Sequence, residues 1–388
     1  MSFPINPRLL AVESPPIPEA QGWRAEYSGA LGPMIDLSQA VPGTPPPEAV
    51  LERLAAAAGA GDMTRYGPIL GDAVLREAYS AEVSRLYGAT VPVSATAITA
   101  GCNEAFVTAM LALAGAGDNV ILPVPWYFNH KMTCDMLGIE ARPLPCSAEA
   151  GFVPDVDQAA VLIDARTRAV VLVSPNNPTG AIYPPEVIAG FARLCRARGL
   201  ALVLDETYRD FLSGGNAPHT LFDDSDWGDV LVQLYSFSKA HAIPGHRLGA
   251  MVAAPSVIGE IAKVLDSVQI CPARPAQAVV AWAIEAMRPW REAQRQELQR
   301  RAEACRAAFA HLNGWKLHSI GAYFAYASHP EAGRRPSREV ARDLAARRGV
   351  LALPGPYFGL GQEDHLRLAF ANVGVERIAE LGTRLREE

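Results

Sequence analysis

Six short runs of the chain are almost continuously apolar, and this feature constrains the fold more than any other. The runs occupy residues 97–100, 119–122, 169–173, 200–204, 230–235 and 248–254. Runs of this length without polar alternation suit strands that are buried on both faces. Between most of them, apolar residues recur at helical spacing, as in residues 72–87, 104–114 and 185–198. Strand followed by helix, repeated, predicts an α/β fold in which helices cover both faces of a mostly parallel sheet.

The length of the chain predicts more than one domain. A chain of 388 residues, 49% of them apolar, exceeds what one ordinary core accommodates. Beyond Pro275 the pattern changes to a helical stretch over 277–312, which Pro289 should kink or divide. Shorter elements follow at 323–327, 338–348 and 365–371. We therefore expect a large domain over 46–284, and a smaller α+β domain made of 1–45 and 285–388, with the proline-rich stretch near residue 45 crossing between them as a loop.

Charge and cysteine usage exclude several classes of function. The net charge is −6, and the 35 basic residues are scattered among 41 acidic ones. This balance argues against a nucleic-acid or anionic-membrane surface and favours small metabolites as partners. The six cysteines form no CxxC pair and have no histidine at metal-ligand spacing, so we expect reduced thiols and no metal site. With neither an apolar leader nor a membrane-length run, the sequence predicts a soluble, cytoplasmic protein.

Polar groups collect where the predicted strands end. Gly101, Cys102 and Asn103 follow the first strand, and residues 126–127, 176–177, 205–208 and 236–239 follow the later ones. In an open parallel sheet, ligands bind beyond the carboxyl ends of the strands, so these groups should face one cleft. Most of these residues could instead have a purely structural role: a turn and helix cap at 101–103, a plain turn at 176–180, a packed aromatic at 127, and a small apolar filler at 102.

Lys239 indicates the chemistry of this cleft. An amine at the end of a buried strand is desolvated, so its neutral, nucleophilic form becomes accessible and can condense with an aldehyde. Ser236, Ser238 and Arg247 lie nearby in sequence and supply donors suited to a phosphate ester. Asp205, at the end of another buried strand, needs a cationic partner, which a protonated pyridine nitrogen would provide. Pyridoxal phosphate carries all three groups.

At this point the chain resembles a known family, the fold-type I pyridoxal-phosphate aminotransferases of class I/II, in the aspartate aminotransferase superfamily. The likeness runs from about residue 36 to residue 372. Its signatures, in order, are Tyr66-Gly67, the turn at Gly101, the NNPTG sequence at 176–180, DETY at 205–208, SFSK at 236–239, Arg247 within 245–249, and Arg367 within 366–372. Each motif is weak alone, but all of them in order make a strong signal. The resemblance implies a large domain with a seven-stranded type of sheet, and a homodimer with shared active sites.

The resemblance also implies a role for each site residue. Lys239 would form the internal aldimine and act as the catalytic base, and Asp205 would pair with the pyridine nitrogen. Tyr208 and Asn177 would hydrogen-bond the phenolic oxygen of the ring, and Tyr127 would stack on its face. The phosphate would be held by Gly101, Cys102, Asn103, Ser236, Ser238 and Arg247, and by Tyr66 of the neighbouring subunit. The substrate would be bound by Gly43, Asn177 and Arg367, the last clamping its α-carboxylate.

The expected reaction is ping-pong transfer of an amino group from an L-amino acid to a 2-oxo acid. The donor, the acceptor and the pathway stay open. Arg274 is a candidate for a second carboxylate or for a structural ion pair, and His130 could face the substrate or be packed. Four aromatic residues suggest a pocket for neutral or aromatic side chains: Trp126, Tyr323, Tyr357 and Phe358. The main rival is a β-lyase that shares these motifs. A cofactor-sensing regulator is a weaker rival, since about 35 residues precede the motifs.

Overall fold

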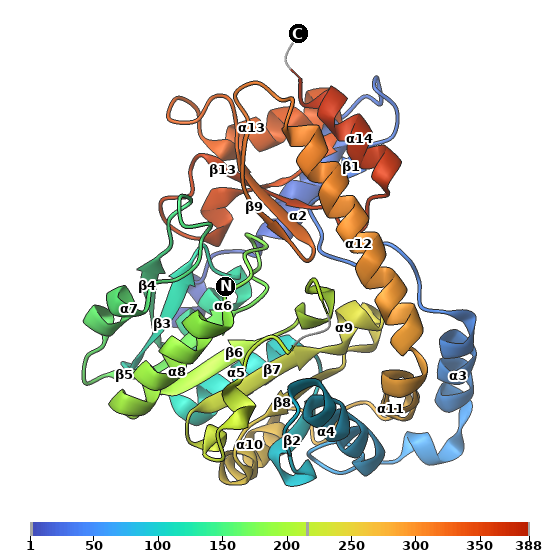
Figure 1. Cartoon of the computed structure of the whole chain (residues 1–388), viewed down its shortest axis with the longest axis vertical. Helices are drawn as coiled ribbons and strands as arrows, with labels where there is room; N and C mark the ends of the chain where they lie inside the picture. The colour runs from blue at the N-terminus through green and yellow to red at the C-terminus, as the bar shows by residue number, and fades with distance from the viewer. Residues whose placement is uncertain (1–2, 215–216, 387–388) are drawn as a thin grey trace.

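The computed structural model describes residues 3–214 and 217–386, and two sheets organise them (Figure 1). The larger sheet has seven strands in the order β2-β8-β7-β6-β5-β3-β4. Their bounds are β2 Thr96–Thr99, β3 Asn119–Val124, β4 Glu140–Pro145, β5 Thr167–Val173, β6 Ala201–Asp205, β7 Leu231–Ser236 and β8 Gly249–Val252. All neighbours are parallel except β8, which runs antiparallel to β2 and β7. The prediction of a mostly parallel α/β sheet is confirmed.

Helices cover both faces of this sheet, which explains the apolar runs. Successive residues of a strand point to opposite faces. Along β5, Val170 and Leu172 join one hydrophobic cluster, whereas Ala169 and Val171 join the other. The first cluster includes residues of α4 (Ala73–Tyr87) and α8 (Pro185–Arg198), and the second includes α5 (Cys102–Leu113) and α10 (Pro255–Val268). A strand packed on both faces has no polar side, as the sequence indicates.

The smaller sheet is antiparallel and has the order β12-β13-β10-β9. Its strands are β9 Lys316–Gly321, β10 Phe324–Ser328, β12 Leu353–Pro354 and β13 His365–Ala369. Near it, the N-terminal strand β1 (Ile35–Asp36) pairs in parallel with β11 (Val350–Leu351), so the first segment of the chain lies among the last ones (Figure 1). The domain limits 46–284 remain a prediction; the large sheet falls within them and the small sheet outside.

The remaining helices connect and flank the two sheets. They are α1 Pro7–Ala11, α2 Pro16–Gly22, α3 Glu48–Gly59, α6 Phe128–Leu137, α7 Val156–Leu162, α9 Phe237–Ala240, α11 Pro275–Ala286, α12 Arg288–Phe309, α13 Ser337–Asp343 and α14 Val375–Arg384. Pro289 lies in the first turn of α12, where its missing N–H costs nothing, so the predicted division of the long helical stretch is confirmed. α12 runs from beside α11 up to α14 and links the two parts (Figure 1). Within the described ranges, no helix combines the length and apolar character needed to cross a bilayer.

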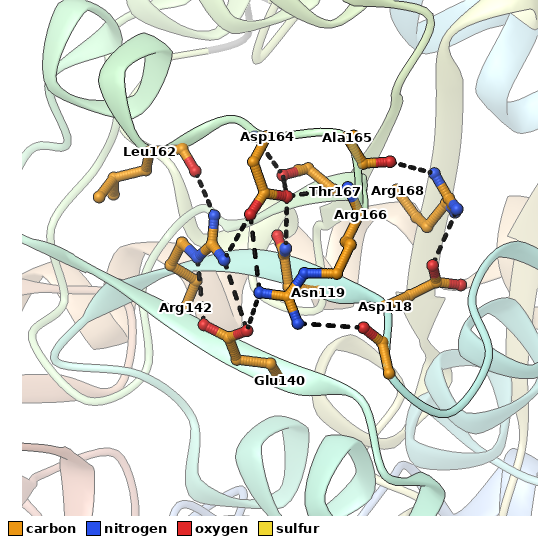
Figure 2. A network of polar contacts seen from close by, with 11 residues as sticks. Asp118, Asn119, Glu140, Arg142, Leu162, Asp164, Ala165, Arg166, Thr167 and Arg168 are labelled. Carbon is orange, nitrogen blue, oxygen red and sulfur yellow. Dashed lines mark hydrogen bonds and ion pairs between the residues drawn. The ribbon is translucent and has the colours of Figure 1, made fainter.

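The edge strand β4 was not among the strands predicted from the sequence, and polar contacts supplement its apolar packing, to which Leu144 contributes a buried side chain. Its residues are mostly exposed or half-buried. Figure 2 shows a network in which the Arg142 guanidinium contacts Glu140, Asp164 and the carbonyl of Leu162, at 2.6–3.2 Å. The buried Asn119 donates to Asp164 at 2.9 Å and ties β3 to the same network. Charged side chains on an edge also discourage pairing with other chains.

Candidate active site

A cavity of about 170 Å³ lies where five strands of the large sheet end. Its lining residues are Cys102, Asn103, Tyr127, Val173, Asn177, Asp205, Thr207, Tyr208, Ser236, Ser238, Lys239, Pro244 and Arg247. β2, β3, β5, β6 and β7 bring their carboxyl ends to this edge, and the antiparallel β8 brings its beginning there, two residues after Arg247. Parallel strands contribute only the residues at their carboxyl ends to this edge. Because β8 runs the other way, the residues before it also lie there, and Arg247 among them adds a positive charge.

Lys239 lies on the short helix α9, which begins directly after β7. The Ser236 side chain caps α9 by accepting from the Ser238 backbone N–H at 3.3 Å. Lys239 Nζ donates to the carbonyl of Ala40 at 2.6 Å. Burial, followed by the positive charges of Arg367 and Arg247, lowers the pKa of the lysine from 10.5 to about 8. The amine is thus far closer to its neutral form at pH 7 than an exposed lysine.

Asp205 is the last residue of β6 and is only 4% exposed. Burial alone would raise the pKa of its carboxyl, but His130 and Thr207 outweigh burial and lower it. His130 Nε2 lies 3.5 Å from Oδ2, and the Thr207 backbone N–H donates to Oδ1 at 2.9 Å. The His130 ring stacks on Phe106 with centroids 3.8 Å apart, which fixes its orientation. Asp205 is therefore a fixed negative charge inside the cavity.

One corner of the cavity is suited to receive an anion. Gly101, with φ of 89°, is the residue before the first turn of α5, and a Cβ there would clash with the Arg247 guanidinium. Arg247 itself has φ of 50° and is anchored by donating from Nη1 to the Pro244 carbonyl at 3.2 Å. The Ser238 hydroxyl is buried without a partner among the described residues. A helix N-terminus, a guanidinium and a free hydroxyl together form the donor set that a phosphate group takes.

Three further predicted residues complete the walls. The Tyr127 hydroxyl donates to Asn103 Oδ1 at 3.3 Å, and burial raises the pKa of Tyr127 to about 12, so the phenol stays neutral. Burial also raises the pKa of Tyr208, whose ring packs against Tyr323 with centroids 5.2 Å apart. Asn177 faces the small sheet through its side-chain oxygen. These residues supply a flat wall and neutral hydrogen-bonding groups beside the two charges.

Arg367 enters the site from the small sheet. It lies on β13, is 2% exposed, and donates from Nη1 to Asn177 Oδ1 at 3.1 Å and from Nη2 to the Ser38 carbonyl. Phe324 and Phe358 lie 5.3 and 5.1 Å from its guanidinium carbon, within cation–π range. Burial lowers the pKa of Arg367 to about 10, so it remains charged at neutral pH. Its Nε has no hydrogen-bond partner within residues 3–214 and 217–386, and a buried guanidinium with such a free donor can receive a carboxylate.

Four predicted site residues do not line this cavity: Gly101 and Arg367, which lie beside it, and Gly43 and Tyr66. A Cβ on Gly43 would meet Arg301 Nη1 and the Ala371 carbonyl, so the close backbone approach at Gly43 serves packing between elements. The carbonyls of Ser38 and Ala40 accept hydrogen bonds from Arg367 and Lys239. Tyr66 is 80% exposed and does not line the cavity of its own chain.

The residues that the sequence left undecided now have positions. Arg274 forms an ion pair with Asp72 at 3.1 Å and also donates to the Asp62 carbonyl, which is the structural alternative. His130 faces Asp205 rather than an open pocket.

The four aromatic candidates do not line the cavity. Phe358 packs under Arg367, and Trp126 donates its backbone N–H to the Phe358 carbonyl at 2.9 Å. Tyr323 packs on Tyr208, and Tyr357 is half-buried outside the cavity. Phe358 and Tyr323 therefore support Arg367 and Tyr208.

Sequence reasoning gave no role to Thr207, Ser38 or Ala40. The carbonyls of Ser38 and Ala40 are backbone atoms, for which residue type gives no signal, whereas Thr207 contacts Asp205 through both its backbone N–H and its side chain. Only the position of Thr207 within residues 205–208 could have drawn attention to it.

Comparison with known proteins places this site in a family. Residues 32–385 match the family model for aminotransferase class I and II. The chain belongs to this family. It is therefore an enzyme, an aminotransferase, as the motifs predict. It is 28% identical to an aromatic aminotransferase of Arabidopsis thaliana over 99% of this chain and 95% of the relative. It is 31% identical to an aspartate/prephenate aminotransferase of Thermus thermophilus over 87% and 86% of the two chains.

The fold agrees with that assignment. The solved structure of the aspartate aminotransferase from Thermus thermophilus with maleate superposes with a TM-score of 0.89, at 27% identity, over 98% of each chain. The curated relatives carry names that differ in the amino acid, and the family match itself specifies none.

Proposed function

We propose that this aminotransferase uses pyridoxal phosphate and moves an amino group from an L-amino acid to a 2-oxo acid by a ping-pong mechanism. One observation carries the proposal: Lys239, Asp205 and an anion-binding corner line one cavity, and Arg367 lies beside it. The cofactor fits this donor set. Ser236, Ser238 and Arg247 would hold its phosphate, together with the start of α5, and Asp205 would meet its ring nitrogen.

When bound, the cofactor supplies an aldehyde that condenses with amines and a ring that accepts electrons from the substrate. Asp205 would hold a proton on the ring nitrogen of the bound cofactor, because a buried carboxylate with a lowered pKa stabilises an adjacent cation. His130 and Thr207 keep Asp205 in place. Tyr208 and Asn177 are proposed to orient the ring through its phenolic oxygen, and Tyr127 to cover one face.

Lys239 is proposed to move the proton. A free amine with a pKa of about 8 is neutral in about one molecule in ten at pH 7, against about one in three thousand for an ordinary lysine. It can therefore take the proton from Cα of the amino acid as a general base and return it as a general acid. The segment at Ala40, whose carbonyl accepts from Nζ, positions the amine over the cavity.

Arg367 is proposed to bind the α-carboxylate of the substrate. Its guanidinium is buried, charged and already oriented by Asn177 and the two phenylalanines. Bidentate binding would fix Cα relative to Lys239. Such orientation lowers the barrier to proton transfer, because the translational and rotational entropy is already lost when the substrate binds. We also propose a cytoplasmic homodimer in which Tyr66 reaches the phosphate of the neighbouring subunit, since its ring is exposed in its own chain.

Trapping the lysine tests the proposal. Borohydride reduction of the protein purified with cofactor, followed by peptide mapping, should place the pyridoxyl group on Lys239. Lys239→Ala should lose the label, the visible absorption of the bound cofactor and turnover. Lys263→Ala is the matched control, because Lys263 is an exposed lysine paired with Glu260. A label on another lysine would contradict the assignment.

A half-reaction screen tests the reaction type. Each amino acid is mixed with the protein, and conversion of the bound cofactor to its amine form is followed by absorbance. Conversion without a second substrate is expected for amino-group transfer. Release of pyruvate and ammonia from a cysteine conjugate, without any oxo-acid acceptor, would instead indicate a β-lyase.

A further inference from the structure

Arg367, the proposed carboxylate-binding group, has only neutral partners within residues 3–214 and 217–386. Its Nη1 donates to Asn177 Oδ1 at 3.1 Å, its Nη2 donates to the Ser38 carbonyl, and two phenylalanine rings flank the guanidinium. Hydrogen bonds from a charged donor are strong where water is excluded. The two oxygen acceptors therefore decide how this buried cation is oriented.

The Ser38 acceptor is itself fixed by a side chain. The strand β1 ends at Asp36, and the next residue, Leu37, still pairs with backbone groups of β11 and β13, both at 2.8 Å. Ser38 pairs with side chains instead. Its N–H donates to Asp36 Oδ1 at 2.9 Å, and its carbonyl accepts from Arg367. The position of the Ser38 carbonyl thus depends on Asp36.

The two carboxylate oxygens of Asp36 have different partners. Oδ1 accepts from the Ser38 N–H and also from the Ser38 hydroxyl, the latter at 2.6 Å. Oδ2 pairs with Arg24, whose side chain is 49% exposed, so this ion pair contributes little. The bonds to Oδ1 form a local turn of the kind that aspartate and asparagine both support. The Oδ1 position, rather than the charge, is therefore what holds Ser38.

Burial makes this anchor necessary. Ser38 is fully buried, and its hydroxyl also accepts from Nε2 of Gln21, on α2, at 2.8 Å. Without an acceptor at Asp36 Oδ1, the Ser38 N–H would have no partner at a position closed to water. An unpaired buried donor is costly, so the segment would shift to satisfy it. The Ser38 carbonyl would move with the segment, and Arg367 would lose one of its two oxygen acceptors.

We propose that Asp36 is a positioning residue for the α-carboxylate of the amino acid: through Oδ1 it fixes Ser38, whose carbonyl orients Arg367. The inference rests on the proposed function, because it takes Arg367 to bind that carboxylate. Asp36 does not line the cavity, so its effect passes through Ser38 and not through contact with the substrate.

Two substitutions separate geometry from charge. Asp36→Asn keeps an oxygen at Oδ1 and loses the charge, whereas Asp36→Glu keeps the charge and moves both oxygens by one methylene. In the protein with its cofactor, Asp36→Glu should raise the KM for the amino acid by about tenfold, with a smaller change in kcat, because a misplaced orienting group is costly. Asp36→Asn should leave KM close to that of the original protein. Asp36→Ala removes both oxygens, should raise KM as Asp36→Glu does, and serves as the second test should Asp36→Glu not fold.

Arg24→Gln and Asp155→Ala are the controls. Arg24→Gln breaks the ion pair at Oδ2 and leaves the bonds to Oδ1 in place. Asp155 is a matched carboxylate outside the cavity, since its Oδ1 accepts from the N–H groups of Asp157 and Gln158, at 2.8 and 2.9 Å, at the start of α7. Both controls should leave KM unchanged, even if they lower the midpoint of thermal unfolding.

Crystal structures of the Asp36→Glu and Asp36→Asn proteins, each with cofactor, give a readout that needs no turnover. The Arg367 guanidinium should be displaced from the Ser38 carbonyl in Asp36→Glu and stay in place in Asp36→Asn. An unmoved Arg367 or an unchanged KM in Asp36→Glu would overturn the proposal, as would an equal rise of KM in Asp36→Asn or Arg24→Gln. If no amino acid converts the bound cofactor, the proposed function fails, and the crystal comparison still decides whether Asp36 positions Arg367.

Discussion

At the scale of single residues, the catalytic proposal rests on Lys239 having a lowered pKa. Burial is the largest cause, and the cations Arg367 and Arg247 follow. A lysine whose folded pKa is below its unfolded value gains its neutral form as pH rises through the folded value. In cofactor-free protein, the rate of cofactor incorporation should therefore rise with pH around an inflection near 8, and not near 10.5. Stopped-flow absorbance at a series of pH values measures it.

The cause of the shift can be checked in the same experiment. Arg367→Gln removes one of the two cations that disfavour the charged amine, so the inflection should move upward in that variant. Arg300→Gln is the control, because Arg300 is exposed and paired with Glu297 far along α12. An inflection above pH 10 in the original protein would show that the amine is not desolvated as described.

At the scale of elements, the position of Arg367 relative to Asn177 depends on two glycines in contact. Gly180 belongs to the turn after β5, and Gly321 ends β9 of the small sheet. A Cβ on either would overlap the backbone of the other. Gly321 has no left-handed φ, so an alanine there adds bulk without backbone strain.

Gly321→Ala should push the small sheet away from the turn and misplace Arg367. The KM for the amino acid should rise by about tenfold, since small misplacements of an orienting group are costly, while the cofactor stays bound. Steady-state kinetics and the cofactor absorbance measure the two effects. Gly374→Ala is the control, because nothing lies within 4 Å of its Cβ position. Loss of cofactor in Gly321→Ala, with KM unchanged, would place the effect elsewhere.

The strands and the cavity residues also show how much of the fold and of the candidate site could be predicted from the sequence alone. The apolar runs predicted the inner strands because those strands are buried on both faces. The edge strand β4 was missed because most of its residues are exposed or half-buried and Arg142 makes ion pairs there. Side-chain chemistry and the family resemblance together predicted most of the cavity residues from Cys102 to Arg247, but not Val173, Thr207 or Pro244. Neither could find Ser38 or Ala40, which act through carbonyls, and the resemblance implied Gly43 as a point of close backbone approach. That approach exists, but Arg301 and Ala371 make it.

At the scale of the whole molecule, Tyr66 is an expected site residue that does not reach the cavity of its own chain. Tyr66 is exposed and lines no part of its own cavity, although its motif resembles a phosphate ligand. If two copies share their sites, each site takes Lys239 from one chain and Tyr66 from the other. Each variant alone should be impaired, since both of its sites carry the same defect.

A mixture of the two variants therefore distinguishes shared sites from separate ones. In a hybrid dimer, the Lys239→Ala chain still offers Tyr66 to its neighbour, whose Lys239 is intact, so one site is complete and the other carries both defects. Random reassociation of equal amounts makes half of the dimers hybrid, and activity should recover to about a quarter of the original, because one site in two is complete in half of the dimers. Mixing without dissociation should recover nothing. If mixed and reassociated chains stay at the mean of the separate variants, Tyr66 acts within its own chain or not at all, and the dimer is not what completes the site.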